Sequence, residues 1–290
     1  MLIVLILYCL TLFGMLLWAV MQIFKDSYEF PYNRIWFPKL KDFTLVNFSG
    51  MIEYADMEWL VTMKGSRSVP ITEIIFNSIV YSVGGAFIHV LVTCIVAYLA
   101  SKYKYWYSRI LYGTVIIVMI IPVVGSQASE IEILTKLGLY NTRYSFVVLK
   151  AGFVGIYFLV FYEMFRSIPN AYSEAAMIDG ANDWYVMVRI YMPLIRNVFM
   201  TVFLITFITF WNDYQMPLLY MPDYPTLSYF LFKLQTSSKA IELADGRFVD
   251  LSYPTVKMAA TVVLMTPILI IFITLHDKLM GNLTIGGVKG

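Results

Sequence analysis

Long apolar segments separated by shorter polar ones form the pattern of this chain. The first, residues 2–24, carries no charge and is rich in Leu, Ile and Met. No basic leader precedes it and no small-residue cleavage site follows, so we expect a retained helix rather than a signal peptide. A bilayer core of ~30 Å is crossed by about 20 helical residues. The pattern therefore predicts an all-α polytopic membrane protein with six transmembrane helices, at 2–24 and at about 74–100, 110–125, 144–162, 198–221 and 258–275.

The polar connections predict the sidedness of the chain. The second apolar segment is followed by Lys102, Lys104 and Arg109 with no acidic residue among them. Such a short basic loop is typical of the cytoplasmic side of a membrane. With six spans, residues 166–196 and both chain ends share that side. We therefore expect a first helix with an external loop in 1–70, a core of five helices in 71–277, a second external loop in 222–253 and a cytoplasmic tail in 278–290.

Composition supports a membrane protein and argues against several other classes. Mean hydropathy is +0.72 and 14% of the residues are charged, against about 25% in soluble domains. The formal charge of +2 gives no indication of nucleic-acid binding. Cys9 and Cys94 lie in apolar segments and His89 and His276 are isolated, so we expect neither a disulfide nor a metal site. No G-x-x-x-x-G-K-S/T phosphate loop is present, so we do not expect this chain to hydrolyse ATP.

A polar, helix-compatible segment, residues 174–193, lies between the fourth and fifth apolar segments. Its alanine pair favours a smooth helical face, and Gly180 permits a sharp turn. Asn182 and Asp183 can cap a second short helix. Pro193 is expected to close the segment with a kink or a helix end. These features predict a helix-turn-helix elbow on one face of the membrane, shaped to enter a groove in a soluble partner.

The elbow resembles the EAA signature of permease subunits in ATP-binding-cassette importers, which reads E-A-A, three residues, G, nine residues and I-x-L-P. Met192 stands where Leu is usual, a volume-conserving exchange. An ordinary amphipathic connector would explain a bare E-A-A triplet, but it does not explain twenty residues in register between two spans. The matching positions are Glu174, Ala175, Ala176, Gly180, Ile190 and Pro193.

This resemblance implies one half of a type I importer in the inner membrane of a bacterial cell. The chain would pair with a second permease subunit and dock two ATPase subunits, which bind ATP and Mg. It would receive substrate from an extracytoplasmic solute-binding protein, and it would hold no cofactor and perform no catalysis. The residues implied to couple it to the ATPase are Glu174, Ala175, Ala176, Asp179, Gly180, Ala181 and Pro193.

Two further motifs, the tetrapeptide at 211–214 and the closing G-G-V-K-G at 286–290, resemble the carbohydrate branch of these permeases, of the maltose type. They imply an oligosaccharide substrate. An ionisable group such as Asp213 inside a span usually faces a cavity or a partner. Alternatively, Asp213 and its neighbour Asn212 satisfy backbone groups freed where Pro217 breaks the helix. The candidates for the translocation path are Asp213 and Asn212, with Trp211 and Tyr214, which could stack on sugar rings or serve packing.

Other interpretations stay open on the sequence alone. The elbow indicates that an ATPase docks but not which solute is carried, so a peptide or an amino acid is an alternative to a sugar. A secondary transporter would not need the elbow and should show inverted repeats. An intramembrane enzyme would need two titratable groups converging on one position, for which Glu163 or Asp213 with His89 are the candidates.

Three remaining features receive weaker assignments. Lys150 lies about two turns into its apolar segment and can snorkel outward, so no transport role is assigned to it. The loop 224–250 could reach the binding protein or be a plain solvated connector. The tail 283–290 could insert near the ATPase interface or fray, as glycine-rich ends do.

Overall fold

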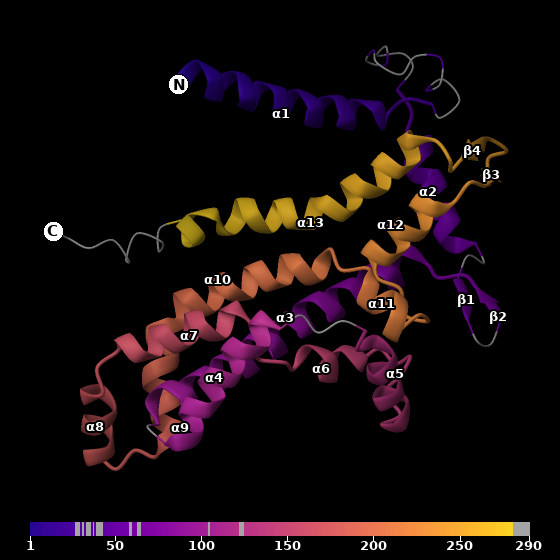
Figure 1. Ribbon diagram of the computed structural model, residues 1–290. Coiled ribbons are helices and arrows are strands. Elements are labelled where there is room, and N and C mark those ends of the chain that lie inside the picture. Colours follow the sequence, from indigo (N-terminus) through magenta and orange to yellow (C-terminus); the bar gives the residue numbers. More distant parts are fainter. Residues whose placement is uncertain are drawn as a thin grey trace. The chain divides into compact units, whose positions relative to one another are not determined.

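The structure is a computed structural model that describes residues 1–26, 30, 32, 36, 38, 43–57, 60–62, 65–103, 105–121 and 125–280. Within these residues the chain forms two compact units (Figure 1). The first comprises Met1–Ser78 and Pro222–His276, and the second is centred on Ile79–Met221. Helix dominates both units, as the apolar pattern predicts.

The first unit contains the N-terminal helix and most of the polar segments of the chain. The apolar side chains of its first helix are exposed to the surroundings of the chain, where lipid or another membrane helix can cover them. The prediction of an all-α fold omits two small antiparallel hairpins in this unit. Its elements are α1 (Leu2–Gln22), α2 (Val46–Asp56), β1 (Leu60–Thr62), β2 (Gly65–Arg67), α12 (Leu227–Thr236), β3 (Ala240–Glu242), β4 (Phe248–Asp250) and the larger part of α13 (Pro254–Met280).

Helix α2 packs closely against the second hairpin. A Cβ added to Gly50 would lie 2.9 Å from Cγ1 of Val249 in β4, so only glycine allows this approach. Glu53 Oε2 accepts a hydrogen bond from the backbone N–H of Ala244 at 2.9 Å. The ring of Tyr54 packs on Phe230 of α12, with centroids 5.8 Å apart. The polar segments that precede α3 and α13 therefore form one packed body rather than two separate loops.

Gly50→Ala is expected to destabilise the first unit by about 1–3 kcal/mol, because the β-branched Val249 must move to admit the new methyl group. Gly113→Ala is the matched control: no atom lies within 4 Å of its added Cβ, and alanine should stabilise this helix by about 0.5–1 kcal/mol. Thermal unfolding of both variants in detergent measures the difference. Equal melting temperatures for the two variants would contradict the packing of α2 on β4.

The second unit is built on α3, which begins in the first unit and continues through the second. Helices α4, α7 and α10 pack against it in one hydrophobic cluster (Figure 1). The elements are α3 (Ile71–Lys102), α4 (Trp106–Ile120), α5 (Gln127–Lys136), α6 (Ser145–Lys150), α7 (Ile156–Ser167), α8 (Ala171–Ile178), α9 (Asp183–Val186), a π-helical turn (Met187–Tyr191), α10 (Met192–Trp211) and α11 (Gln215–Tyr220).

Four described helices are long and apolar enough to cross a membrane, namely Leu2–Gln22, Ile71–Lys102, Asp183–Trp211 and Pro254–Thr274, and Trp106–Ile120 is a shorter apolar helix. The fourth predicted segment, 144–162, is not one helix. It breaks after Lys150 and resumes at Ile156, because two glycines lie between them and Gly155 takes φ +156°, a backbone conformation that other residues rarely adopt. The fifth predicted segment, 198–221, is likewise interrupted after Trp211.

Candidate functional site

The predicted elbow begins with α8, which carries the Glu-Ala-Ala triplet. Gly180 follows the helix with φ +85°. The N–H of Gly180 donates to the carbonyl of Met177 at 3.0 Å, and the N–H of Ala181 donates to the carbonyl of Ala176 at 2.9 Å. This pair of bonds is the Schellman arrangement, which ends a helix through a left-handed residue. The turn predicted at Gly180 is confirmed, and its cause is the backbone conformation of that glycine.

The second half of the elbow begins at Asn182, whose Oδ1 accepts a hydrogen bond from the N–H of Tyr185 at 2.8 Å. The predicted cap is confirmed for Asn182, which precedes the first residue of α9, Asp183. Helix does not end at Pro193, since helical residues run without a break from Asp183 to Trp211, and Pro193 lies in the first turn of α10, directly after the π-helical turn. Immediately before Pro193, the N–H of Met192 bonds to the carbonyl of Met187 five residues back. This π-helical turn shifts the pattern of backbone hydrogen bonds by one residue. The proline, which has no N–H to donate, is therefore accommodated within the helix.

The elbow is exposed and partly apolar. No residue of α8 is buried, Glu174 is exposed, and Ile178 is 86% exposed. A recess of about 570 Å³ lies in the turn between α8 and α9, with Asp179, Gly180 and Ala181 among its lining residues. Exposed apolar side chains next to a recess indicate a surface that a protein partner covers. The large apolar side chains exposed on the elbow are Tyr172, Met177, Ile178, Trp184 and Tyr185.

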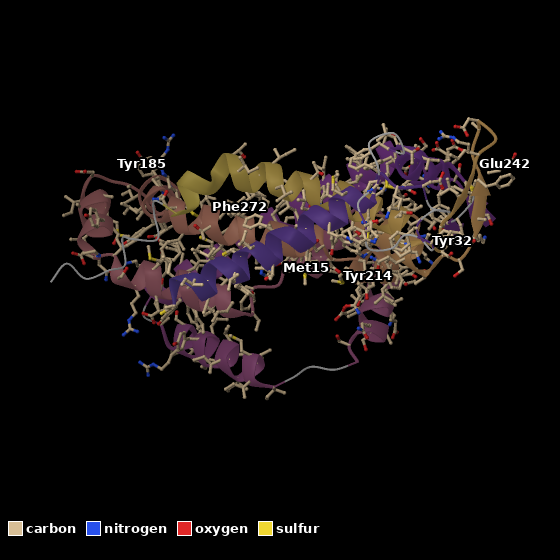
Figure 2. All side chains as sticks on the ribbon, turned by 90° about the horizontal axis from the view of Figure 1, so that it is seen from above. Met15, Tyr32, Tyr185, Tyr214, Glu242 and Phe272 are labelled. Atoms are coloured by element: carbon tan, nitrogen blue, oxygen red, sulfur yellow. The ribbon has the colours of Figure 1, made fainter. Side chains whose placement is uncertain are left out.

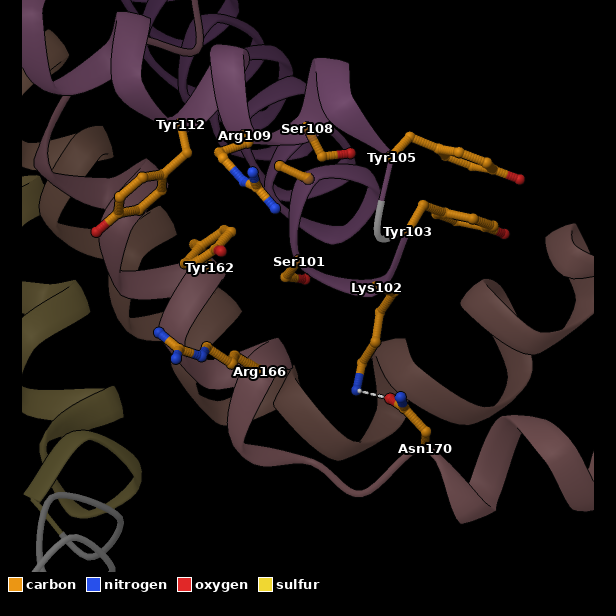
Figure 3. Close-up of a pocket in the computed structure, with 11 residues that line it drawn as sticks. Ser101, Lys102, Tyr103, Tyr105, Ser108, Arg109, Tyr112, Tyr162, Arg166 and Asn170 are labelled. Carbon is orange, nitrogen blue, oxygen red and sulfur yellow. Dashed lines mark hydrogen bonds between the residues drawn. The ribbon is translucent and has the colours of Figure 1, made fainter.

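A lysine from α3 holds the base of the elbow. Lys102 Nζ donates to the carbonyl of Ile168 at 2.6 Å and to Oδ1 of Asn170 at 3.1 Å (Figure 3). The same ammonium lies 4.7 Å from the centre of the Tyr191 ring, and the Tyr191 hydroxyl donates to Oγ of Ser173 in α8 at 3.3 Å. Both ends of the elbow are therefore tied to the end of α3.

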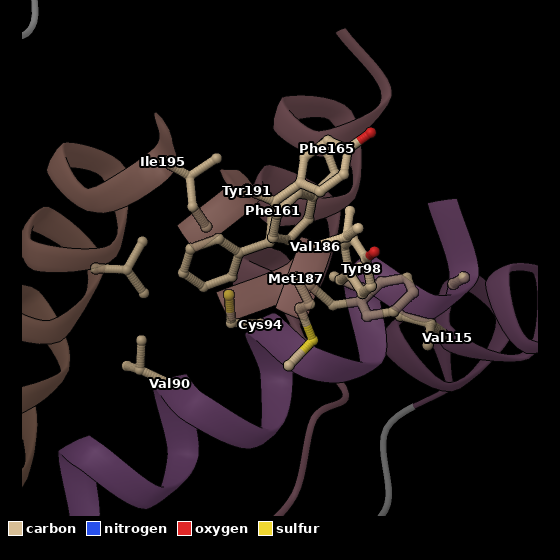
Figure 4. Packing of buried hydrophobic residues seen from close by; sticks show 14 residues of the cluster. Val90, Cys94, Tyr98, Val115, Phe161, Phe165, Val186, Met187, Tyr191 and Ile195 are labelled. Carbon is tan, nitrogen blue, oxygen red and sulfur yellow. The ribbon is translucent and has the colours of Figure 1, made fainter. Parts of the chain in front are cut away.

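Aromatic packing continues this anchor into the hydrophobic core. Tyr191 is fully buried, and its ring lies 5.3 Å from that of Tyr98 and 6.2 Å from that of Phe165 (Figure 4). These rings come from the elbow, α3 and α7. Burial and a hydrogen bond to Asp183 raise the pKa of Tyr103 above its usual value. The elbow is therefore in close side-chain contact with two helices, α3 and α7.

A second candidate site surrounds Asp213, just beyond the other end of α10. Oδ2 of Asp213 accepts hydrogen bonds from the Tyr81 hydroxyl at 2.5 Å and from Lys150 Nζ at 3.1 Å. Oδ1 accepts the N–H of Met216 at 3.2 Å, at the start of α11. The side chains of Lys150 and Asp213 are 11% and 19% exposed. A buried ion pair therefore joins α6, α3 and the break between α10 and α11.

The outward position expected for Lys150 is wrong. Its ammonium lies 4.0 Å from the centre of the Phe210 ring and 5.6 Å from that of Tyr81, so two aromatic faces and a carboxylate surround it. His89 Nδ1 lies 3.3 Å from the backbone carbonyl of Lys150, not from its side chain. At membrane depth an ammonium gains more from a carboxylate within the protein than from a strained path to the headgroups.

The four candidates for the translocation path divide between two uses. Asn212 Nδ2 donates to the carbonyl of Ile208 at 2.8 Å and so satisfies the end of α10. Trp211 is 4% exposed and packs on Phe207, so its ring serves core packing and does not stack on a sugar in this conformation. Tyr214 keeps an exposed ring. Asp213 accepts a backbone N–H at the helix break and pairs with Lys150. Its place on the translocation path stays a prediction, as does that of Tyr214.

The two sites are connected by one helix. Tyr185 of the elbow and Tyr214 beside Asp213 lie near opposite ends of the helix from Asp183 to Trp211 (Figure 2). Twenty-nine residues at 1.5 Å per residue span about 43 Å, more than the ~30 Å core of a bilayer. A rigid helix of this length can carry a displacement from the elbow to the buried ion pair.

Sequence reasoning missed the roles of Lys102, Tyr191, Tyr81 and Lys150 in these two sites. A signal for Lys150 was present: it is a cation within an apolar segment, and Asp213 is an acid within another. Charges at membrane depth usually pair with one another, so this pair could have been proposed. Nothing local marks Tyr81 and Tyr191 among the 22 tyrosines of the chain.

Comparison with protein families decides the class. The family described as binding-protein-dependent transport system inner membrane component matches residues 90–282. The chain belongs to this family of permeases. The matched range contains the elbow, Lys150 and Asp213, and the resemblance inferred from the elbow is thereby confirmed.

Several characterised permeases are similar to this one over most of their length. The diacetylchitobiose uptake system permease protein NgcG of Streptomyces coelicolor is 25% identical over 211 residues, which are 72% of this permease and 67% of NgcG. The sulfoquinovosyl glycerol transport system permease protein SmoH of Agrobacterium fabrum is 24% identical over 94% of this permease and 88% of SmoH. The polygalacturonan/rhamnogalacturonan transport system permease protein YtcP of Bacillus subtilis is 26% identical over 76% of this permease and 79% of YtcP.

The fold agrees with the family. A chain in the crystal structure of a bacterial ABC transporter involved in the import of the acidic polysaccharide alginate superposes with a TM-score of 0.74. The match covers 95% of this permease and 93% of that chain, at 20% sequence identity. This permease therefore has the fold of an ABC importer subunit, as the resemblance implied.

Proposed function

We propose that this permease forms half of the translocation path of an ATP-driven importer that receives an oligosaccharide from a binding protein. The observation that carries the proposal is the elbow. It combines an exposed helix, a left-handed glycine turn and a base that is hydrogen-bonded to α3. This arrangement can enter a groove of an ATPase subunit and pass on its movement without unfolding.

The proposed mechanism is alternating access driven from the elbow. When ATP closes a pair of ATPase subunits, Glu174 is the charge that contacts the groove and the two alanines allow close approach. Tyr191 and Lys102 then transmit the displacement to α3 and α10. The buried Lys150–Asp213 pair at the far end of α10 belongs to the part that must rearrange around the solute. Because separating this pair would leave a buried charge without its partner, the surrounding helices are expected to switch between two discrete arrangements rather than deform gradually.

The assembly and its location are part of the same proposal. A second permease subunit completes the path, two ATPase subunits bind ATP and Mg, and a solute-binding protein delivers the substrate. The permease lies in the inner membrane of a bacterial cell, with the elbow and both termini in the cytoplasm. The basic residues at the end of α3 and in the first turn of α4, Lys102 and Arg109, support this orientation.

An oligosaccharide is the substrate class that the relatives support. NgcG, SmoH and YtcP are each named for the uptake of a sugar derivative or a polysaccharide. Some of these sugars are neutral and others acidic, and Lys150 is already paired with Asp213. We therefore propose an oligosaccharide substrate and assign no charge to it.

Cross-linking of the complete importer tests the proposal. A photoactivatable maleimide is attached to Ile178→Cys in a Cys9→Ser background, since Cys9 is exposed and Cys94 is buried. The same reagent on Glu132→Cys in α5 is the control. We expect a cross-link to the ATPase from position 178 and none from position 132. ATP-dependent uptake into proteoliposomes is then measured with neutral and acidic oligosaccharides, a dipeptide and an amino acid. Absence of the cross-link, or uptake of only the last two solutes, would refute the proposal.

A further inference from the structure

A basic cavity lies beside the elbow, and two of its lining residues, Lys102 and Asn170, also form the anchor of the elbow. Its volume is about 530 Å³. It is enclosed by the end of α3, the start of α4, the end of α7 and the residue that precedes α8 (Figure 3). The side chains that matter for its chemistry are Lys102, Ser108, Arg109, Tyr112, Tyr162 and Arg166.

The charge of the cavity is positive. Three of its described lining residues are cationic and none is acidic. Lys102 is held by Ile168 and Asn170, and Arg166 makes only an exposed contact with Glu163, at 3.4 Å. Arg109 has no hydrogen bond or ion pair with any residue that the structure describes. The cavity therefore offers a guanidinium whose charge no described residue neutralises.

The start of α4 adds donors to this charge. The hydroxyl of Ser108 is buried, with the residue 6% exposed, and it has no hydrogen-bond partner among the described residues. Tyr105, which precedes α4, provides no side-chain cap, and the first turn of α4 carries no acid. The first N–H groups of a helix favour an anion, and a buried hydroxyl without a partner is costly. One anionic group in the cavity would complement the helix end, and rotation of the Ser108 side chain would let its hydroxyl donate to the same group.

The surroundings of the cavity place it at the depth of lipid headgroups. Trp106 is 75% exposed at the start of α4, with Tyr105 and Tyr107 exposed on either side. Exposed Trp and Tyr side chains are typical of the membrane–water interface. Further along α4, Ile110, Ile117 and Ile120 are exposed and can meet acyl chains. A lipid beside α4 can therefore keep its chains in the bilayer while its headgroup enters the cavity.

We propose that this cavity binds the phosphate of an anionic phospholipid from the cytoplasmic leaflet. Anionic lipids are concentrated at that surface and are attracted by basic side chains there. The assignment to this leaflet rests on the proposed function, which places the elbow in the cytoplasm. The lipid joins α3, α4 and α7 at the point from which Asn170 leads into the elbow, so it steadies the base through which movement is transmitted.

Photolabelling of the intact importer tests the site. The importer is placed in phosphatidylcholine nanodiscs that contain a phosphatidylglycerol with a photoactivatable headgroup, and the labelled peptides are mapped. We expect labelling within residues 100–112 that unlabelled phosphatidylglycerol competes away and phosphatidylethanolamine does not. Arg109→Gln should reduce the labelling about fivefold, since it removes one basic contact. Ser108→Ala should reduce it severalfold with no loss of folding, because the unpaired hydroxyl is removed. Lys136→Gln, in α5 and outside the cavity, is the matched control and should have no effect.

Four results would overturn the lipid site. The first is no label within residues 100–112, and the second is equal labelling of Arg109→Gln and the native importer. The third is competition by inorganic phosphate as effective as that by phosphatidylglycerol. The fourth is labelling that appears only when the ATPase is removed. The third result would assign the cavity to a soluble anion, and the fourth to the ATPase surface. Labelling does not depend on transport, so it can persist if the proposed sugar uptake fails and can be absent if uptake succeeds.

Discussion

Gly180→Ala combined with Glu174→Lys is expected to uncouple ATP hydrolysis from sugar uptake. Gly180 has φ +85°, and an L-residue in the left-handed region costs roughly 1–2 kcal/mol. The alanine therefore favours rearrangement of the turn that ends α8, while the lysine reverses the charge offered to the ATPase. A mispaired charge in a protein interface costs several kcal/mol. We expect uptake into proteoliposomes to fall at least about 30-fold, with ATP hydrolysis continuing.

The control for this experiment is Glu132→Lys with Gly113→Ala, which makes the same two chemical changes away from the elbow. Uptake by the control should match that of the native importer, because Glu132 is exposed in α5 and the added methyl at Gly113 meets no atom within 4 Å. Membrane levels of both double variants should be equal. Native uptake by the elbow variant would remove the elbow from the coupling mechanism.

Breaking the buried ion pair is expected to have the largest effect on stability. Asp213→Leu alone leaves the ammonium of Lys150 buried between Phe210 and Tyr81 without its carboxylate. Removing one partner of a buried pair typically costs about 3–5 kcal/mol. Lys150→Met alone should cost less, since Asp213 keeps its bonds from Tyr81 and Met216. These losses of stability are measured as the melting temperature of the complete importer in detergent.

The double variant Lys150→Met/Asp213→Leu separates a structural role from a transport role. Two apolar side chains of similar volume should restore most of the lost stability. If the pair only supports the fold, uptake returns with stability. If it lies on the translocation path, the double variant is stable and does not transport, which is the result we expect. The exposed pair Lys136–Glu132 is the control, and its removal should leave the melting temperature unchanged.

The apolar pattern predicts the helices where one physical requirement dominates. In α1, α3 and α13, long uncharged segments need a hydrocarbon environment, and each is a continuous helix. The same pattern fails to predict helix breaks that depend on the backbone conformation of single residues. Segment 144–162 is apolar enough to span, yet it breaks between Lys150 and Ile156 because hydropathy does not report the conformations of its glycines.

The elbow shows the same division at the level of single residues. The turn at Gly180 and the cap at Asn182 are local, since their bonds join residues three to five positions apart, so the sequence predicts them. The continuation of helix through Pro193 is not local in this sense. It depends on a π-helical turn, whose cost is offset by packing of Tyr191 between Tyr98 and Phe165.

The sequence by itself predicted a polytopic permease, the long helices α1, α3 and α13, and the position and turn of the elbow. These depend on hydropathy and on hydrogen bonds between near neighbours, both of which are written in consecutive residues. Tertiary structure decided the partners of Asp213, the anchoring of the elbow by Lys102 and the basic cavity beside α4. Each of these brings together side chains more than 50 positions apart, and only the packing of helices determines which of them meet.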